Sequence, residues 1–218
     1  MKTAFLTLFI SLLFSFSAPE KSFSGTFNIK LESTKNKGVV MLSECFVNNA
    51  KLLVLTYASN TPDKKRKMLV NGDEKTMYYL DDDKKTAMKI SLETMAQAGN
   101  MEAPQITETS EYKTIDGYKC RKTNEINKTS TSEIWTTEDI NVNFSKVANA
   151  FAYLSKKKGG SLGPNYGLKG FPIEIITTEN GDGFVSTIHY TDIKAGPVDE
   201  SIFDLTGYKV TDVMAGGR

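Results

Sequence analysis

Short apolar segments separated by turn-forming residues run through most of this chain, and they constrain its fold more than any other feature. In the first segment, Phe23, Phe27 and Ile29 alternate with polar residues. Period-two alternation of this kind predicts a strand with one buried and one solvated face. Turn-forming pairs such as Asn48-Asn49 and Asp116-Gly117 separate later segments and predict tight hairpins. We therefore expect a sheet built mainly of antiparallel neighbours.

Two of the segments are apolar on both faces. Val39-Val40-Met41-Leu42 and Leu52-Leu53-Val54-Leu55 interrupt the alternation. A strand with two apolar faces needs cover on both, so either a helix packs on the second face or that face lines a cavity. The expected strands are residues 23–32, 38–47, 51–57, 67–70, 75–80, 86–90, 108–114, 118–125, 131–136, 171–178 and 183–190, followed by a turn or short helix at 197–203 and a final extended piece at 208–213.

Helical spacing is clearest at residues 143–157, where Phe144, Val147, Phe151 and Leu154 form one apolar stripe. A shorter helix is expected after Ser91, a suitable N-cap residue. Strands greatly outnumber helices in this reading. We therefore expect an α+β fold that is mainly β, with a curved antiparallel sheet and a few helices laid on one face.

The first residues have the pattern of an export signal. Lys2 supplies a positive charge, residues 4–16 are almost entirely apolar, and Ser15 and Ser17 are small residues at positions suited to cleavage. An apolar run of about thirteen residues is short for a membrane span, which needs roughly twenty. We expect a cleaved signal peptide at residues 1–17 and a single domain at residues 18–218. Ala18, and not a cysteine, directly follows the expected cleavage site. We therefore expect a soluble periplasmic or secreted protein with no lipid anchor and no transmembrane span.

The charge balance argues against nucleic acid or an anionic membrane as an electrostatic partner. The chain has 27 Lys and Arg against 26 Asp and Glu, so the summed field that would attract a polyanion is small. Two basic runs, at 64–67 and 156–158, lie beside turn residues. We interpret both runs as solvated loop charges.

Cys45 and Cys120 are the only cysteines, and both fall in expected strands. In an oxidising compartment they could form a disulfide, which would stabilise the fold by closing a long loop. They could equally be two separate buried thiols that pack as small apolar groups. The sequence does not place their strands side by side, so both possibilities stay open.

Few residues suggest catalysis or metal binding. His189 is the only histidine, and no G-x-S-x-G sequence accompanies it, so an ordinary strand histidine is the favoured interpretation. Asp81-Asp82-Asp83 lacks the spacing of a calcium loop and is typical of a hairpin turn. The glycine-rich segment 159–170 follows a helix, whereas a phosphate-binding loop precedes one. We expect no cofactor, no metal site and no enzymatic activity, while a carboxylate pair from distant strands stays open as an alternative.

Flexible apolar side chains are more numerous than one sheet face needs. Methionine adapts to irregular shapes, so these residues suit a pocket for an apolar ligand, with an ordinary core as the alternative. The residues expected to line such a pocket are Met41, Leu53, Leu55, Met77, Tyr79, Met88 and Phe151.

From Glu111 onward the chain resembles a family of exported bacterial domains of unknown function. The resemblance rests on the segments 112–120 (YKTIDGYKC), 133–137 (EIWTT), 170–173 (GFPI), 201–204 (SIFD) and 207–209 (GYK), in that order. This family in turn is similar to the lipoprotein-localisation-factor (LolA/LolB-like) superfamily. The resemblance implies a curved sheet folded into a half-open barrel, with helices on its concave side and acyl chains or similar lipids bound in the cavity.

The residues of these segments have structural interpretations of their own. We expect Trp135 to pack a helix against the sheet and Phe203 to fix the tail onto the barrel. The favoured function is a periplasmic protein that binds or carries a lipid or acyl chain. The alternative is an envelope protein that uses the same sheet for protein–protein interaction or assembly and holds no small ligand.

Overall fold

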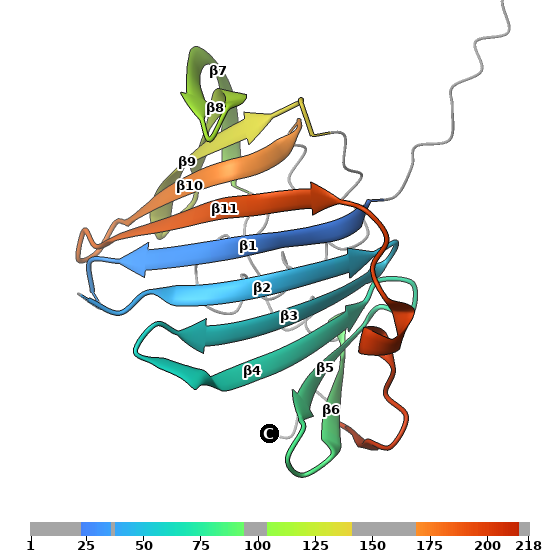
Figure 1. Ribbon diagram of the computed structural model, residues 1–218. Helices are drawn as coiled ribbons and strands as arrows, with labels where there is room; N and C mark the ends of the chain where they lie inside the picture. The colour runs from blue at the N-terminus through green and yellow to red at the C-terminus, as the bar shows by residue number, and fades with distance from the viewer. Residues whose placement is uncertain (1–22, 36–37, 94–103, 141–168, 214–218) are drawn as a thin grey trace, which may run out of the picture.

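The computed structural model describes residues 23–35, 38–93, 104–140 and 169–213, and within them it has one large sheet (Figure 1). Every region expected to be a strand is part of this sheet. The strands are β1 (Ser24–Ser33), β2 (Met41–Asn48), β3 (Lys51–Ala58), β4 (Thr61–Asn71), β5 (Thr76–Asp81), β6 (Thr86–Ser91), β7 (Gln105–Ile115), β8 (Tyr118–Ile126), β9 (Ser130–Thr137), β10 (Phe171–Glu179), β11 (Val185–Ala195) and β12 (Lys209–Asp212).

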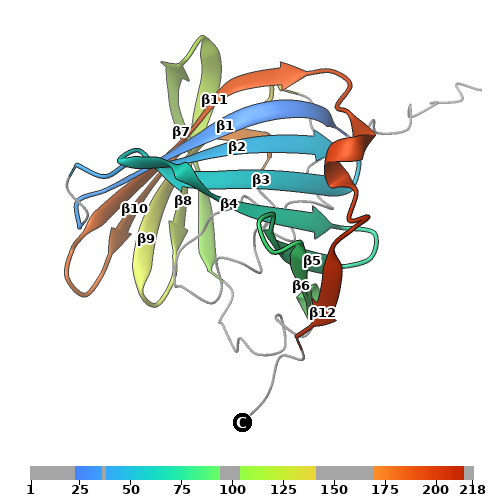
Figure 2. The same ribbon diagram turned by 60° about the horizontal axis from the view of Figure 1, so that its bottom comes forward.

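The strand order is β12-β6-β5-β4-β3-β2-β1-β11-β10-β9-β8-β7. All neighbours are antiparallel except β12, which pairs with β6 in parallel. Figure 2 shows the sheet curving so that β5 and β6 lie on one side of a concavity and β8 and β9 on the other, without closing. The expected curved, mainly β architecture is therefore confirmed.

The expected helices on the concave side are not borne out. The described residues include one complete helical element, the 3-10 turn η1 (Glu200–Phe203), which lies on the opposite face, and Leu92 and Glu93 are also helical. The helix expected at 143–157 and most of the one expected after Ser91 lie outside the described residues, as does the signal peptide expected at 1–17. No helix in the described part is long and apolar enough to cross a membrane.

The concave or inner face is the face that carries Phe27, Cys45, Val54 and Ile134, and it holds the main apolar core. These residues share a face because the strand register links them through Leu31, Ile188 and Ile175. Three aromatic rings fill the centre of this core. Phe171 makes edge-to-face contacts with Phe27 and Tyr190, at ring-centroid distances of 5.8 and 5.5 Å. Such T-shaped pairs add to the energy of burial alone.

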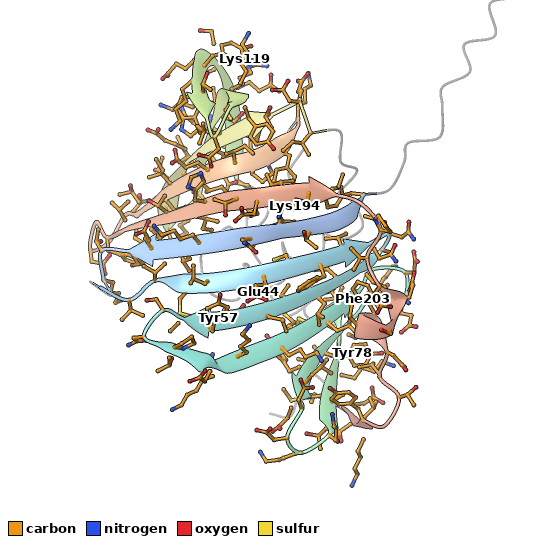
Figure 3. All side chains as sticks on the ribbon, in the orientation of Figure 1. Glu44, Tyr57, Tyr78, Lys119, Lys194 and Phe203 are labelled. Atoms are coloured by element: carbon orange, nitrogen blue, oxygen red, sulfur yellow. The ribbon has the colours of Figure 1, made fainter. Side chains whose placement is uncertain are left out.

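The outer face has a second, smaller core. Residues 198–208, here called the C-terminal strap, cross β3–β6 and bury Phe203 against Leu53, Leu69 and Tyr78. Figure 3 shows Phe203 and Tyr78 on the face turned toward the viewer, together with Glu44 and Tyr57. The strap explains why β3 is apolar on both sides: its second face is covered by the C-terminal segment. The expected role of Phe203 in fixing the tail is confirmed.

Polar contacts hold both ends of the C-terminal strap. Asn48 Nδ2 donates to Glu200 Oε1 at 2.7 Å, and Lys51 Nζ lies 3.4 Å from Glu200 Oε2. At the other end, the Tyr208 hydroxyl donates to Asp82. This hydrogen bond raises the pKa of Tyr208 to about 12 and lowers the pKa of the Asp82 carboxyl. The strap thereby ties the β2–β3 turn to the β5–β6 turn.

The basic run at 64–67 is not a loop but part of β4, which corrects the expectation from sequence. Residues 61–66 pair with β3 but extend past the end of β5, which pairs only with Lys67–Asn71. They are exposed, and Lys65 binds Glu44 at 2.9 Å with its ammonium 5.0 Å from the centroid of the Tyr57 ring. A charged strand is tolerated here because one edge and both faces contact solvent.

At the other end of the sheet, the β7–β8 hairpin bends over the outer face. Asp116 at its tip lies 2.9 Å from His189 on β11, measured from Oδ2 to Nε2. Lys113 pairs with Glu174 on β10, and its ammonium lies 4.2 Å from the centroid of the Trp135 ring. Trp135 is buried on the outer face beneath this hairpin, so its cover is a hairpin where a helix was expected.

Candidate functional site

The strongest candidate site is a row of apolar side chains that crosses the inner face from its buried centre to its edge. The register of β2–β6 places Cys45, Val54, Met68, Tyr79 and Met88 side by side, each directly opposite the next. Cys45 and Val54 are buried, Met68 is half-buried, and Tyr79 and Met88 are 41% and 42% exposed. The row therefore ends in a partly uncovered aromatic and thioether surface.

A second row runs beside the first and is buried over most of its length. It contains Val47, Leu52, Val70, Met77 and Ile90, again by direct cross-strand pairing. Leu52, Val70 and Met77 have no exposed surface. This row gives the exposed surface of the first row a rigid base, because its side chains are close-packed.

The apolar surface has a polar boundary. Ser43 and Thr56 lie on the side of the first row that is away from Met77. They pair with each other across β2 and β3, and their hydroxyl oxygens are 2.9 Å apart. The next position in this direction on β4 is Arg66, paired with Thr56. An apolar ligand on β4–β6 would therefore lie between the Met77 row and this polar edge.

The residues expected to line a pocket are divided between the two faces. Met41, Met77, Tyr79 and Met88 lie on the inner face by register, with Met77 in the core and Tyr79 and Met88 at its open end. Leu53 and Leu55 lie on the outer face, where Leu53 is buried and Leu55 half-buried beside the strap cluster. They cannot share a pocket with the other four. Phe151 lies outside the described residues.

The inner face becomes polar across β8–β10. Ser132 and Thr177 lie opposite each other with their hydroxyl oxygens 2.9 Å apart, and Glu125 pairs with Ser132 in the register. Glu125 is only 2% exposed, and its Oε2 atom has no hydrogen-bond partner. Burial raises the pKa of the Glu125 carboxyl, against the opposing effect of a side-chain hydrogen bond from Asn127. The sequence offered no sign of this group beyond its position in an expected strand.

The two cysteines are free and buried. Cys45 lies on β2 and Cys120 on β8, with β1, β11, β10 and β9 between them. Neighbouring strands are about 4.8 Å apart, whereas the two Cα atoms of a disulfide lie within about 7 Å. The disulfide considered from sequence is therefore not formed, and the alternative of two separate buried thiols is confirmed.

The other residues considered for chemistry have structural surroundings. His189 faces outward, and although its Nε2 lies near Asp116, the contact lacks hydrogen-bond geometry. Asp81-Asp82-Asp83 ends β5 and begins the β5–β6 turn, as expected, and Asp81 Oδ1 accepts from the Lys84 amide at 3.0 Å. Within the described ranges, no group of three or more His, Cys, Asp or Glu side chains could hold a metal ion.

A family model described as "Domain of unknown function (DUF4412)" matches residues 23–207. No curated protein matches the chain. Among solved structures, PNGF-II is 19% identical with a TM-score of 0.49, and the match covers 88% of this chain but only 31% of PNGF-II. The chain thus spans less than a third of the length of that protein.

Two further solved structures match over most of their own length. A DUF1329 family protein from Desulfovibrio piger is 11% identical with a TM-score of 0.38, covering 87% of this chain and 93% of that one. A candidate outer membrane lipoprotein-sorting protein domain from Vibrio parahaemolyticus is 10% identical with a TM-score of 0.37, covering 83% of this chain and 88% of that one.

Proposed function

This chain belongs to the DUF4412 family, and we propose that it binds an apolar ligand, such as a lipid or an acyl chain, against the inner face of its sheet. The proposal is of an exported binding or carrier protein rather than an enzyme. It draws on the signal-peptide pattern of residues 1–17 for its location in the periplasm or beyond. The matching family has no described activity, so the site itself has to supply the argument.

The observation that carries the proposal is the exposure of Tyr79 and Met88 at the end of an otherwise buried row. Large apolar side chains on a solvated surface are costly when clustered, and they mark binding surfaces more often than chance. Methionine and tyrosine suit a ligand of variable shape, because the thioether is flexible and polarizable and the ring offers a broad apolar face. An acyl chain laid along the row would contact Met68, Tyr79 and Met88 in turn.

Burial of such a chain would supply enough energy for binding. Each methylene removed from water contributes about 0.8 kcal/mol. Contact with a chain of ten methylenes would thus give roughly 8 kcal/mol before the cost of association, which is at least about 4 kcal/mol. The net gain of at most about 4 kcal/mol corresponds to a dissociation constant of about 1 mM, so binding of this chain would be reversible.

The proposal is tested by native mass spectrometry of the full-length product, purified from bacteria without organic solvent. We expect a copurifying mass that matches a lipid or fatty acid, released by mild collisional activation and lost after delipidation. The delipidated protein should take up added fatty acid with a defined stoichiometry. The proposal would be contradicted if the protein purified without bound lipid and took up no added fatty acid.

A protein-binding role in the envelope is the second candidate, and strand β7 favours it. This strand covers Gln105–Ile115 and ends the sheet order, so one of its edges has no neighbouring strand among the described residues. An unpaired edge can accept a strand from another protein. Pull-down from envelope extracts tests this role, with Thr107→Pro in β7 as the variant expected to abolish capture of a specific partner.

A further inference from the structure

A charged cleft lies at the β7 end of the sheet, away from the apolar rows. It has a volume of about 260 Å³, slightly below the range of about 300–1,000 Å³ typical of pockets for drug-sized ligands. A small polar molecule or a headgroup fits this size better than an acyl chain. Its lining residues are Glu108, Tyr112, Lys119, Arg121, Thr123, Thr136, Glu138, Asp139 and Lys169.

The backbone around Gly170 builds one wall of the cleft. Gly170 has a φ of +86°, and a Cβ at this position would lie 2.4 Å from the carbonyl oxygen of Thr137. Only glycine allows the chain to re-enter the sheet this close to the end of β9. This close approach places Lys169 beside Glu138 and Asp139, across from the β7–β8 hairpin.

Hydrogen bonds fix the residues on both sides of the cleft. The Lys119 amide donates to Asp139 Oδ2 at 3.3 Å, and the Asp139 amide donates to Thr137 Oγ1 at 3.2 Å. Arg121 Nε donates to the Thr109 carbonyl at 2.8 Å, and its Nη1 lies 2.9 Å from Glu108 Oε2. The guanidinium and the Glu108 carboxylate, both of which line the cleft, therefore neutralise each other.

The remaining charges of the cleft are of both signs and lack ion-pair partners within the described residues. The Lys119 ammonium lies 4.9 Å from the centroid of the Tyr112 ring, and Lys169 forms no ion pair with any residue that the structure describes. Among the described residues, Glu138 likewise forms no ion pair, and the Asp139 carboxylate accepts from the backbone amide of Lys119. Two ammonium groups and two carboxylates thus line one small space without neutralising each other.

From this arrangement we propose that the cleft binds a small zwitterionic group, one that carries an oxyanion and a primary ammonium. Lys119 and Lys169 would hold the oxyanion, and Glu138 and Asp139 would hold the ammonium. A simple anion would be attracted by the lysines but repelled by the two carboxylates. A simple cation would be attracted by the carboxylates but repelled by the lysines. The inference is independent of the apolar-ligand function, because it uses none of the residues of the apolar rows.

Free O-phosphoethanolamine is the probe that tests the cleft, measured by calorimetric titration of the full-length product at low ionic strength. We expect saturable binding at least about tenfold tighter than that of inorganic phosphate or ethanolamine alone. Lys169→Gln and Glu138→Gln should each weaken binding by about tenfold, because each removes one half of the complementary charge. Lys64→Gln, at an exposed lysine on β4, is the matched control and should leave the affinity unchanged.

Vesicles distinguish a lipid headgroup from a free metabolite as the source of this chemistry. Phosphatidylcholine vesicles with and without phosphatidylethanolamine are compared by cosedimentation. Binding that needs phosphatidylethanolamine and both Lys169 and Glu138 identifies a headgroup, whereas binding of the free probe alone identifies a soluble ligand. The proposal is overturned if neither source binds, if phosphate alone binds as well as phosphoethanolamine, or if Glu138→Gln has no effect.

Discussion

Cys45 and Cys120 lie on opposite faces of one continuous sheet, with four strands between the strands that carry them. Cys45 faces the inner core, next to Val54, whereas Cys120 lies within the β7–β8 hairpin, opposite Lys113, and both are buried. The two thiols therefore report on the packing of two separated parts of the sheet.

Thiol labelling should show both cysteines reduced and unreactive in the native protein. Burial raises the pKa of both thiols, so almost no thiolate is present at neutral pH. Ellman's reagent should modify neither in buffer and both in denaturant, without prior reduction. Val210→Cys, at a position 45% exposed, supplies the positive control and should react quickly. A native protein that yields no free thiol after unfolding would contradict the strand order.

Removal of the Phe203 side chain should destabilise the protein by about 3 kcal/mol, because it empties the centre of the outer core. Urea denaturation followed by tyrosine and tryptophan fluorescence measures this loss. Val210→Ala, on the neighbouring exposed strand β12, should change stability by less than about 0.5 kcal/mol. Equal effects of the two substitutions would show that the C-terminal strap does not stabilise β3–β6.

Gly170→Ala should be destabilising, whereas Gly181→Ala should be nearly neutral. A Cβ at Gly170 would overlap the Thr137 carbonyl and the φ of +86° strains any other residue, while a Cβ at Gly181 meets nothing within 4 Å. Strain of this kind costs on the order of 1–3 kcal/mol. Thermal unfolding of the two variants side by side measures the difference, and a larger loss at Gly181 would refute the geometry given for the cleft.

Glu125 should make the stability of the protein depend on pH. Its folded-state pKa is raised by burial, so the protonated form is favoured in the fold. The contribution is full below the ordinary glutamate pKa of about 4.3 and is lost as the pH rises through the folded-state pKa. The isosteric variant Glu125→Gln should flatten this part of the profile of melting temperature against pH. Glu179→Gln, at the end of β10, should retain the wild-type profile, and an unchanged profile in Glu125→Gln would contradict the assignment.

The strands could be predicted from sequence because alternation reports directly on a half-buried sheet. Residues 61–66 do not alternate, because a strand segment that extends past its neighbour is solvated on both faces, and here it carries charges at the four successive positions 63–66. The two apolar faces of β3 correctly predicted that other parts of the chain pack on both sides of this strand. They could not identify the C-terminal strap as the segment on the outer side, because Phe203 lies about 150 residues further along the chain. No local sequence pattern links Phe203 to β3.

The candidate site depended on register, which sequence alone does not supply. Tyr79 and Met88 could be recognised as unusual apolar residues, but only cross-strand pairing places them together at one end of the inner face. The same pairing places Leu53 on the outer face, one residue away from Val54 on the inner face. Successive residues of a strand face opposite sides of the sheet. Pocket residues chosen by residue type alone therefore come from both faces.

Binding of a fluorescent fatty acid, cis-parinaric acid, to matched variants tests the central claim most directly. Met88→Glu and Val210→Glu place the same charge on neighbouring strands at positions of similar exposure, 42% and 45%, but on opposite faces. We predict saturable binding to the wild type, a loss of affinity of about tenfold or more in Met88→Glu, and no change in Val210→Glu. No binding to the wild type, or equal losses in the two variants, would contradict the assignment of the inner face as the ligand site.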